Sequence, residues 1–196
     1  MTKKGSLIFS LLLSVVVMGR QLDEISAERL VLQTDYGNIH VGFFRQAAPK
    51  TVSHIIRLAE MGAYNTNHFF RVHKGFVAQI ADVIGGRTLS LDESQAGAAS
   101  LTVPLEVHKS LKHDRKGILS MARQEDPNSG GSSFSILLGP APHLDMQYTN
   151  FGVVTKGFDS LKAMEGVEIH RQGIFIMPKK RVGIHSTYLY VSCVLW

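Results

Sequence analysis

The chain has 196 residues, with 44% hydrophobic and 19% charged side chains and a formal net charge of +5 at pH 7. These values are typical of a soluble globular protein, and the length suits one domain with a sizeable core. Apart from the run 179–181, lysine and arginine are scattered and do not alternate with aromatic residues, so we expect no nucleic-acid partner. The single cysteine, Cys193, excludes an internal disulfide.

The first residues have the pattern of a secretory signal peptide. Lys3 and Lys4 form a positive start, the run 6–18 is apolar, and small residues precede a cleavage site after Gly19. The apolar run is shorter than the roughly 20 residues that a membrane-spanning helix needs. We therefore expect residues 1–19 to direct the protein to the secretory pathway (endoplasmic reticulum lumen or secretion), with no membrane span after cleavage. An uncleaved anchor is the alternative.

The first part of the mature chain predicts a β-hairpin followed by a helix. Strand-like runs at 30–34 and 38–44 flank a turn signal that includes Gly37. The helix is expected to begin at Pro49, because proline is tolerated in a first helical turn, and to end at Gly62. Its apolar residues recur at helical spacing and are Val52, Ile55, Ile56 and Ala59.

The remaining predicted elements are short. Apolar runs predict strands at 118–122, 134–138, 151–155, 174–177 and 182–190. Residues 159–164 predict a second helix, residues 87–100 lack periodicity and predict a surface loop, and Pro104 favours an edge strand or a loop. Many short strands with two helices, and no regular alternation of strand and helix, argue for antiparallel sheet that is closed or sandwiched.

One stretch, residues 68–79, sets an arginine and a glutamine among aromatic and aliphatic side chains. Alternation along a strand places Arg71 and His73 on one face of its first half, and Val77 and Gln79 on one face of its second half. A glycine between the halves allows the chain to bend, so that both faces can line one concavity. A guanidinium is a permanently charged donor that cannot act as a base. The chemistry indicated here is therefore electrostatic.

Three blocks of sequence carry a resemblance to a known family. Residues 69–79 have an aromatic residue, any residue, arginine, three further residues, then Gly-Phe-x-x-Gln. Residues 117–136 and 144–154 supply two more matching blocks in the same order and spacing. In these blocks the chain resembles the cyclophilin-type peptidyl-prolyl cis-trans isomerases, and the resemblance extends from about Leu30 to about Tyr190.

The resemblance implies a fold and an activity. The expected fold is mainly β, a closed eight-stranded antiparallel β-barrel with two capping α-helices. It would occupy residues 30–190, after a connector at 20–29 and before a short apolar tail at 191–196. The implied function is isomerisation of X-Pro peptide bonds by a monomer that assists protein folding, acts on proline-containing peptides or unfolded chains, and needs no cofactor. No metal site is expected, because the histidines lack partners at ligand spacing.

The resemblance also implies roles for individual residues. Arg71 matches the catalytic arginine, and Gln79 matches a glutamine that bonds the substrate backbone and helps to position the arginine. The residues that match the apolar proline socket are Phe76, Val77, Leu144 and Tyr148. Ala122 and Arg123 match the strand edge along which a bound peptide lies extended.

The chain departs from the family pattern in and beside the socket. Ser135 stands where a phenylalanine usually forms the socket floor, and Ser133 stands where a glutamine is usual. Alternation puts these two serines on one face and Phe134 inside the barrel. His143 replaces a tryptophan associated with cyclosporin, so we expect weak or no cyclosporin binding, and Tyr148 replaces a histidine. These departures motivate an alternative function, a catalytically weak module that binds peptides or a partner.

Overall fold

The structure, a computed structural model, describes residues 22–173 and 175–192. The predicted signal peptide (1–19), Cys193 and most of the predicted apolar tail lie outside the described residues. Within the described part of the chain, no helix combines the length and the apolar character needed to cross a membrane.

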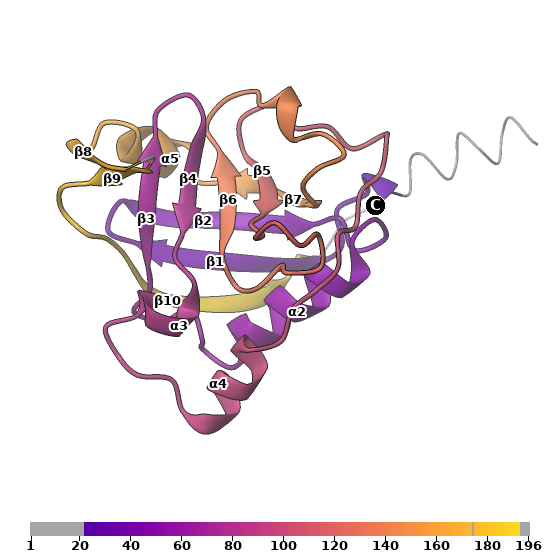
Figure 1. The fold of residues 1–196 in the computed structure, drawn as a ribbon, viewed down its shortest axis with the longest axis horizontal. Coiled ribbons are helices and arrows are strands. Elements are labelled where there is room, and N and C mark those ends of the chain that lie inside the picture. The colour runs from indigo at the N-terminus through magenta and orange to yellow at the C-terminus, as the bar shows by residue number, and fades with distance from the viewer. Residues whose placement is uncertain (1–21, 174, 193–196) are drawn as a thin grey trace, which may run out of the picture.

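Eight strands close into an antiparallel barrel in the order β1-β10-β3-β4-β6-β5-β7-β2 (Figure 1). Their bounds are β1 Glu28–Thr34, β2 Gly37–Phe43, β3 His68–His73, β4 Val77–Ile80, β5 Ile118–Met121, β6 Phe134–Leu137, β7 Asn150–Lys156 and β10 Val182–Val191. The fold predicted from the resemblance is therefore confirmed. The predicted strands 118–122, 134–138, 151–155 and 182–190 match observed strands within one or two residues at each end.

The interior of the barrel is filled by the inward-facing side chains of its strands. Alternation along β1 buries Leu30 and Leu32 completely. The Phe134 ring makes edge-to-face contacts with Tyr64 and Phe151, at centroid distances of 5.9 and 5.6 Å. Because aromatic and aliphatic side chains occupy this space, a substrate must bind on the outside of the barrel.

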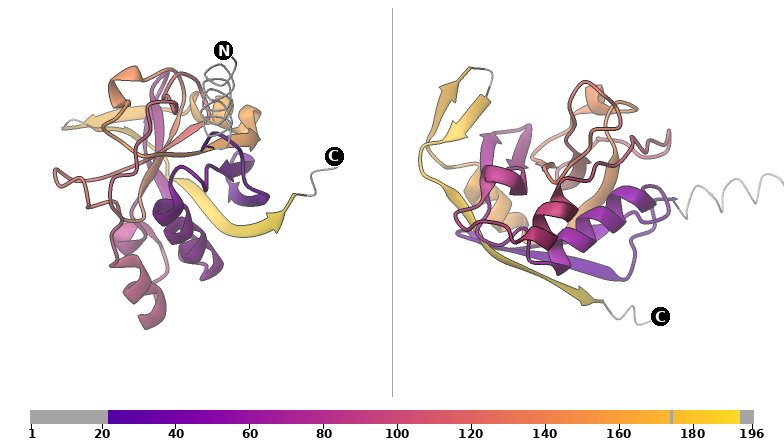
Figure 2. Two further views of the ribbon diagram at one scale, coloured as in Figure 1. Left: turned by 90° about the vertical axis from the view of Figure 1, so that its right-hand side faces the viewer. Right: turned by 60° about the horizontal axis from the view of Figure 1, so that its bottom comes forward.

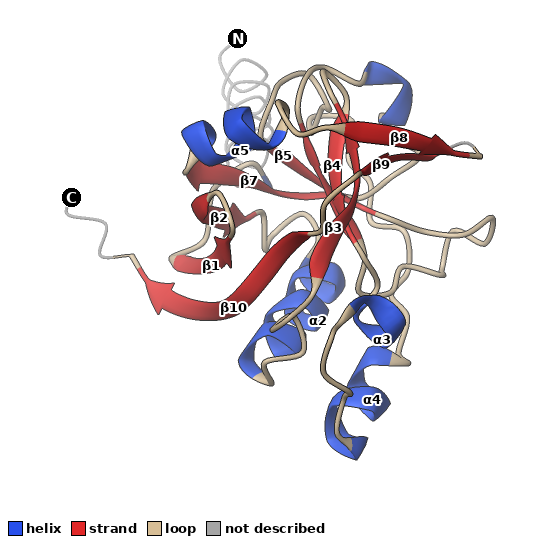
Figure 3. Cartoon of the chain, turned by 90° about the vertical axis from the view of Figure 1, so that its left-hand side faces the viewer, coloured by secondary structure: helices blue, strands red, loops and turns tan. Residues whose placement is uncertain are grey.

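Two helices lie on opposite sides of the barrel, α2 (Pro49–Glu60) and α5 (Phe158–Met164), as Figure 3 shows. The apolar face of α2 is buried, as its helical spacing predicts. A distant carboxylate caps this helix, since Glu106 accepts bonds from the backbone N–H groups of Lys50 and Thr51 at 3.1 and 2.8 Å. A negative charge at a helix N-terminus is favourable, so this contact ties a long loop to α2.

The prediction of a surface loop at 87–100 was wrong for its second half, which forms α4 (Glu93–Ala99). A capping box starts this helix: Asp92 accepts a bond from the Gln95 N–H at 2.8 Å, and the Gln95 side chain accepts one from Asp92 N–H. The helix has no apolar stripe because only its small residues Ala98 and Ala99 are buried. Two adjacent buried alanines do not produce the helical spacing of apolar residues by which a helix is predicted from sequence.

Two further short elements were not predicted, so the described residues include four α-helices and one turn of 3₁₀ helix rather than two helices. The four-residue element α3 (Val83–Gly86) is a turn in which Ile84 and Gly85 have non-helical angles. A single turn of 3₁₀ helix, η1 (Pro142–Leu144), follows β6. Both border the groove described below.

The strand predicted at 174–177 exists as β9 (Phe175–Pro178), but it does not join the barrel. It pairs with β8 (Ile169–Gln172) in a separate two-stranded sheet that projects from the barrel (Figure 2). All four residues of β8 are exposed. Because neither face of β8 is buried, its sequence shows no alternation by which the strand could be predicted.

The capping box predicts a measurable contribution to stability. Asp92→Ala should lower the free energy of unfolding by about 1 kcal/mol, because it leaves a helix N–H without its acceptor. Urea unfolding followed by circular dichroism measures this difference. Ser90→Ala, at an exposed position two residues earlier, is the matched control and should leave the unfolding midpoint unchanged. Equal midpoints for the two variants would contradict the capping role.

Candidate active site

A groove of about 700 Å³ lies on the outer face of the barrel, over strands β3, β4, β5 and β6 and the adjoining loops. All the site residues predicted from the resemblance line it except His143. They are Arg71, Phe76, Val77, Gln79, Ala122, Arg123, Ser133, Ser135, Leu144 and Tyr148. Residues that are far apart in the sequence therefore converge on one concavity.

An irregularity in β3 directs the arginine into this groove. The register between β3 and β4 shifts between Phe69 and Arg71, so that Phe69 is fully buried in the core while Phe70 and Arg71 both line the groove. The two strands then pair Arg71 with Gln79. The guanidinium carbon lies 5.3 Å from the centre of the Phe76 ring. The cation thus lies beside an aromatic wall of the groove.

Partial burial affects both the pKa of Arg71 and the strength of its electrostatic interactions. Burial lowers the pKa of Arg71 from its ordinary value, and the hydroxyl of Tyr148 acts in the opposite direction. An arginine remains charged at neutral pH despite such a shift. The groove therefore holds a permanent positive charge that is shielded from bulk water, where its interactions are stronger than at an exposed site.

The side chain of Gln79 is held by one of the substituted positions. Its amide nitrogen donates to Ser133 Oγ at 3.2 Å, and Ser133 Oγ donates to the carbonyl oxygen of Ile80 at 2.7 Å. Ser133 is thus a positioning residue for the glutamine. The two serines do lie on one face, with Phe134 fully buried behind them, as alternation predicts.

The apolar part of the groove is backed by a separate hydrophobic cluster. Phe76 and Leu144 are partly buried and pack against Ile118, Leu137 and Ala141. This contact holds the ring and the leucine side chain in place, and it leaves their exposed sides to the groove. The result is a preformed apolar socket beside Arg71.

Tyr148 forms another wall and is supported by Arg123. The Arg123 guanidinium lies 4.8 Å above the Tyr148 ring. It also donates to the carbonyl oxygens of Gln147, Gln124 and Glu125 at 3.0, 2.8 and 3.1 Å. Through these contacts the Arg123 side chain supports the Tyr148 wall of the groove and the loop that contains Arg123.

His143 is the one predicted site residue that is absent from the groove lining, and its role in substrate binding stays a prediction. It is exposed on η1, and its ring lies 5.4 Å from the Phe76 ring. The next residue, Leu144, does line the groove. His73 likewise does not line the groove and instead contacts the edge of Phe76 at 5.6 Å.

Sequence reasoning missed several groove residues, including Phe70, Met121 and Ser120. The bulge that exposes Phe70 leaves no signal in the sequence. Ser120 does have a signal in the sequence: it lies two residues before Ala122, and alternation places both side chains on the same face.

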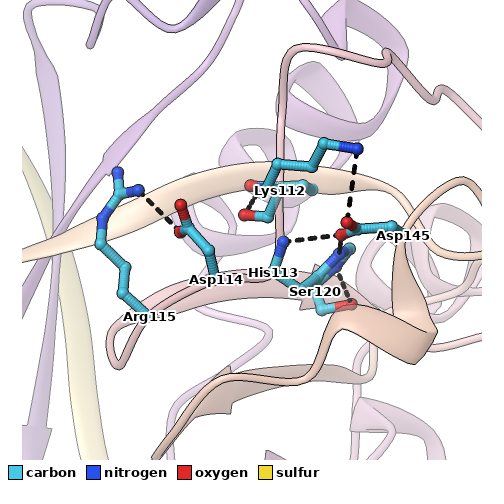
Figure 4. Close-up of polar contacts among 7 residues, drawn as sticks. Lys112, His113, Asp114, Arg115, Ser120 and Asp145 are labelled. Atoms are coloured by element: carbon cyan, nitrogen blue, oxygen red, sulfur yellow. Dashed lines mark hydrogen bonds and ion pairs between the residues drawn. The ribbon is translucent and has the colours of Figure 1, made fainter.

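A buried polar chain lies behind the groove floor (Figure 4). Ser120 Oγ and His113 Nε2 are 3.0 Å apart, and His113 Nδ1 and Asp145 Oδ1 are 3.1 Å apart. The backbone N–H of His113 donates to the same Asp145 oxygen at 2.8 Å, and the Lys112 ammonium lies 3.5 Å from the other. No three metal-binding side chains in the described part of the chain gather closely enough to hold an ion.

The ionisation of this chain follows from its surroundings. Burial lowers the pKa of His113 from its ordinary value and outweighs the opposing effect of Asp145. Burial acts to raise the pKa of Asp145, but hydrogen bonds from His113 and the charge of Lys112 outweigh it and keep this pKa low. At neutral pH the imidazole is therefore neutral and the carboxylate is charged. Nδ1 then donates to Asp145, and the Ser120 hydroxyl donates to Nε2.

Comparisons with known proteins agree with this geometry. Residues 29–188 match the family model for "Cyclophilin type peptidyl-prolyl cis-trans isomerase/CLD". Peptidyl-prolyl cis-trans isomerase CYP23 of Arabidopsis thaliana is 54% identical over 167 residues, which cover 85% of this chain and 73% of that protein. Peptidyl-prolyl cis-trans isomerase-like 3 of Homo sapiens is 35% identical over 147 residues, 73% of this chain and 85% of that protein.

A solved structure extends the likeness to three dimensions. It is a Cryptosporidium parvum cyclophilin type peptidyl-prolyl cis-trans isomerase, crystallised in the presence of the dipeptide Ala-Pro. Its TM-score against this chain is 0.70 at 27% sequence identity, and the match covers 84% of this chain and 99% of that one.

The buried histidine predicts a pH dependence. Because the pKa of His113 is lower in the folded protein than the ordinary value of 6.5, the unfolded chain takes up a proton first as the pH falls. The contribution of His113 to stability is therefore complete above about pH 6.5 and decreases below it. Proton NMR of the His113 ring should give a midpoint below that of a short histidine peptide. A midpoint at or above the peptide value would contradict this environment.

Proposed function

The chain belongs to the cyclophilin-type peptidyl-prolyl cis-trans isomerase family, and from that premise we propose that Arg71 is the electrostatic catalyst of X-Pro bond rotation in its outer groove. The protein is a peptidyl-prolyl cis-trans isomerase, and proline-containing peptides are its class of substrate. The observation that carries the residue assignment is the position of one guanidinium at the rim of a preformed apolar socket.

The reaction needs a group that favours a twisted amide. Resonance across the C–N bond sets a barrier of about 18–20 kcal/mol to rotation. In the twisted state this resonance is lost and the prolyl nitrogen regains a lone pair. A hydrogen-bond donor aimed at that nitrogen stabilises the twisted state more than either planar state, which lowers the barrier.

The apolar socket and the polar residues beside it have different roles in this reaction. The socket formed by Phe76, Val77, Leu144 and Tyr148 receives the prolyl ring, and burial of that ring holds the amide in place. Arg71 then donates to the prolyl nitrogen from the rim. Gln79, its ladder partner, bonds the substrate backbone and keeps the guanidinium in position.

The rest of the peptide lies along the segment that follows β5. The last ladder pair of β5 and β6 joins Met121 to Phe134, and one further bond runs from the Ala122 N–H to the Ser133 carbonyl oxygen at 3.1 Å. This bond anchors Ala122 and Arg123 beside the groove. An extended peptide recognised through backbone groups there is read with little regard to its sequence.

A second candidate function, weak turnover by a module that chiefly binds peptides, is favoured by the hydroxyl-lined floor. Ser135 brings no aromatic surface to the socket, and the lost contact is worth on the order of 1–3 kcal/mol. The two functions separate in one measurement, because a binder shifts peptide resonances without accelerating their exchange.

We propose further that residues 1–19 are a signal peptide and that the mature protein assists the folding of proline-containing chains in the secretory pathway. The support is the basic start, the short apolar run and the small residues before Arg20. Slow X-Pro isomerisation limits the folding of many chains, so an isomerase in that compartment accelerates their folding.

Removal of the guanidinium tests the proposed catalyst. Arg71→Ala should slow catalysed exchange of a short Ala-Pro peptide by about a hundredfold or more, the loss typical of a missing transition-state donor. Exchange NMR measures the rate without a coupled protease, and circular dichroism checks the fold.

Lys74→Ala is the matched control, because this cation is exposed on the next turn and does not line the groove. It should exchange the peptide at the wild-type rate. Wild-type exchange by folded Arg71→Ala would refute the assignment.

The proposed signal peptide can be tested separately. Expressed in a eukaryotic secretory system, the full chain should yield a protein whose N-terminal sequence begins at Arg20. Replacing Lys3 and Lys4 together with acidic residues should reduce its entry into that pathway. A protein that keeps Met1 and remains in the cytosol would contradict the proposal.

A further inference from the structure

A row of side chains crosses four strands on the outer face of the barrel. The ladder pairs are Arg71 with Gln79, Gln79 with Ser135, and Ser135 with Ser120. All four residues line the groove. Directly paired residues have Cβ atoms about 4.5–5.5 Å apart, so the row runs without a gap from the guanidinium to the two hydroxyls.

The two hydroxyls at the far end of the row have unused hydrogen-bonding capacity. Ser135 Oγ has no hydrogen-bond partner among residues 22–173 and 175–192. Ser120 Oγ donates to the neutral His113, whose other nitrogen donates to Asp145, and this leaves the oxygen of Ser120 as an acceptor. A hydrogen bond in such a chain is polarised by the carboxylate at its end. The floor can thus both donate, through Ser135, and accept, through Ser120.

The geometry of a bound prolyl ring places its far carbons against this floor. If the ring nitrogen lies at the Arg71 guanidinium, the β and γ carbons are on the opposite side of the five-membered ring. When the ring lies along the row, these carbons point toward Ser135, which is two strand spacings, or about 10 Å, from β3. An unsubstituted ring presents only C–H groups there. It would leave both hydroxyls facing an apolar surface, which is unfavourable for polar groups removed from water.

We propose that this floor is a hydroxyl-recognition subsite and that the preferred ligand is a peptide containing 4-hydroxyproline. The hydroxyl on the γ carbon accepts a bond from Ser135 and donates one to Ser120. This inference rests on the proposed function of the groove and adds to it the chemical class of the substrate. A floor of this kind distinguishes substrates because a site with polar groups rejects a ligand that cannot pair with them.

Exchange NMR on matched short peptides tests the proposal. The peptides differ only in the ring: proline, 4-hydroxyproline of either configuration, and 4-fluoroproline, which has a small polar substituent but cannot donate. The wild-type protein should favour one hydroxyproline epimer over proline and over fluoroproline in kcat/KM. Ser135→Ala should reduce the hydroxyproline-to-proline ratio about two- to tenfold, the effect expected for one hydrogen bond.

Two further variants sharpen this test. Ser135→Phe should invert the preference, raising the rate on proline because the ring restores apolar contact and excluding the hydroxylated ring. Ser133→Ala is the matched control, since the Ser133 hydroxyl is already bonded to Gln79 and Ile80. It should change the rates on both peptides together and leave their ratio as in the wild type.

The outcomes separate this inference from the proposed function. If the wild-type protein accelerates exchange but its ratio is one or below, or if Ser135→Ala leaves the ratio unchanged, the subsite is refuted while the isomerase stands. If neither peptide exchanges faster, the dissociation constants of the same peptides from chemical-shift titration decide the matter. A tighter hydroxyproline complex that Ser135→Ala weakens supports the subsite, and equal affinities refute it.

Discussion

The cross-strand register of β3, β4, β6 and β5 is the constraint on which the site depends. It aligns a cation, an amide and two hydroxyls on one outer face, in the order Arg71, Gln79, Ser135 and Ser120. A slip by one residue in any of these strands would turn its member of the row into the core and bring an apolar side chain out. The filled interior prevents such a slip, because fully buried side chains such as Phe134 have no room on the other face. Core packing therefore secures the chemistry outside.

The loop that follows β6 serves the groove and its support at the same time. Leu144 belongs to the socket, and Asp145, the next residue, holds the imidazole of His113. His113 in turn holds the hydroxyl of Ser120 on the groove floor. Movement of this loop would displace the apolar wall and the polar floor together. The position of the floor hydroxyl thus depends, through His113, on the half-buried carboxylate of Asp145, which does not line the groove.

The chain keeps the arginine and the glutamine of the family motif, Arg71 and Gln79, and departs from the family pattern at Ser133 and Ser135. In the mechanism proposed above, partial burial of Arg71 strengthens its interaction with a developing lone pair, and this does not depend on what lies at the socket floor. In the same mechanism, Ser135 affects only how well the site fits the prolyl ring. The proposed mechanism therefore treats the rate of rotation and the choice of ring as separable properties of this groove. Such separation allows substrate class to diverge while catalysis is retained.

The sequence by itself determined most of the barrel strands, a helix from Pro49 that it expected to end at Gly62, a helix at 159–164, and the arginine and glutamine that meet in the groove. Those features depend on local alternation, helical spacing and a motif of adjacent residues, and all three patterns are visible among residues that are close in sequence. It did not show α4, whose two buried alanines make no period, or β8, which buries neither face. Only the tertiary structure decided that a register shift brings Phe70 to the groove beside Arg71, that His143 packs against Phe76 without lining the groove, and that Ser120 and His113 form a polar chain behind the floor. These features arise from register, turn geometry and contacts between segments far apart in sequence, which no local pattern records.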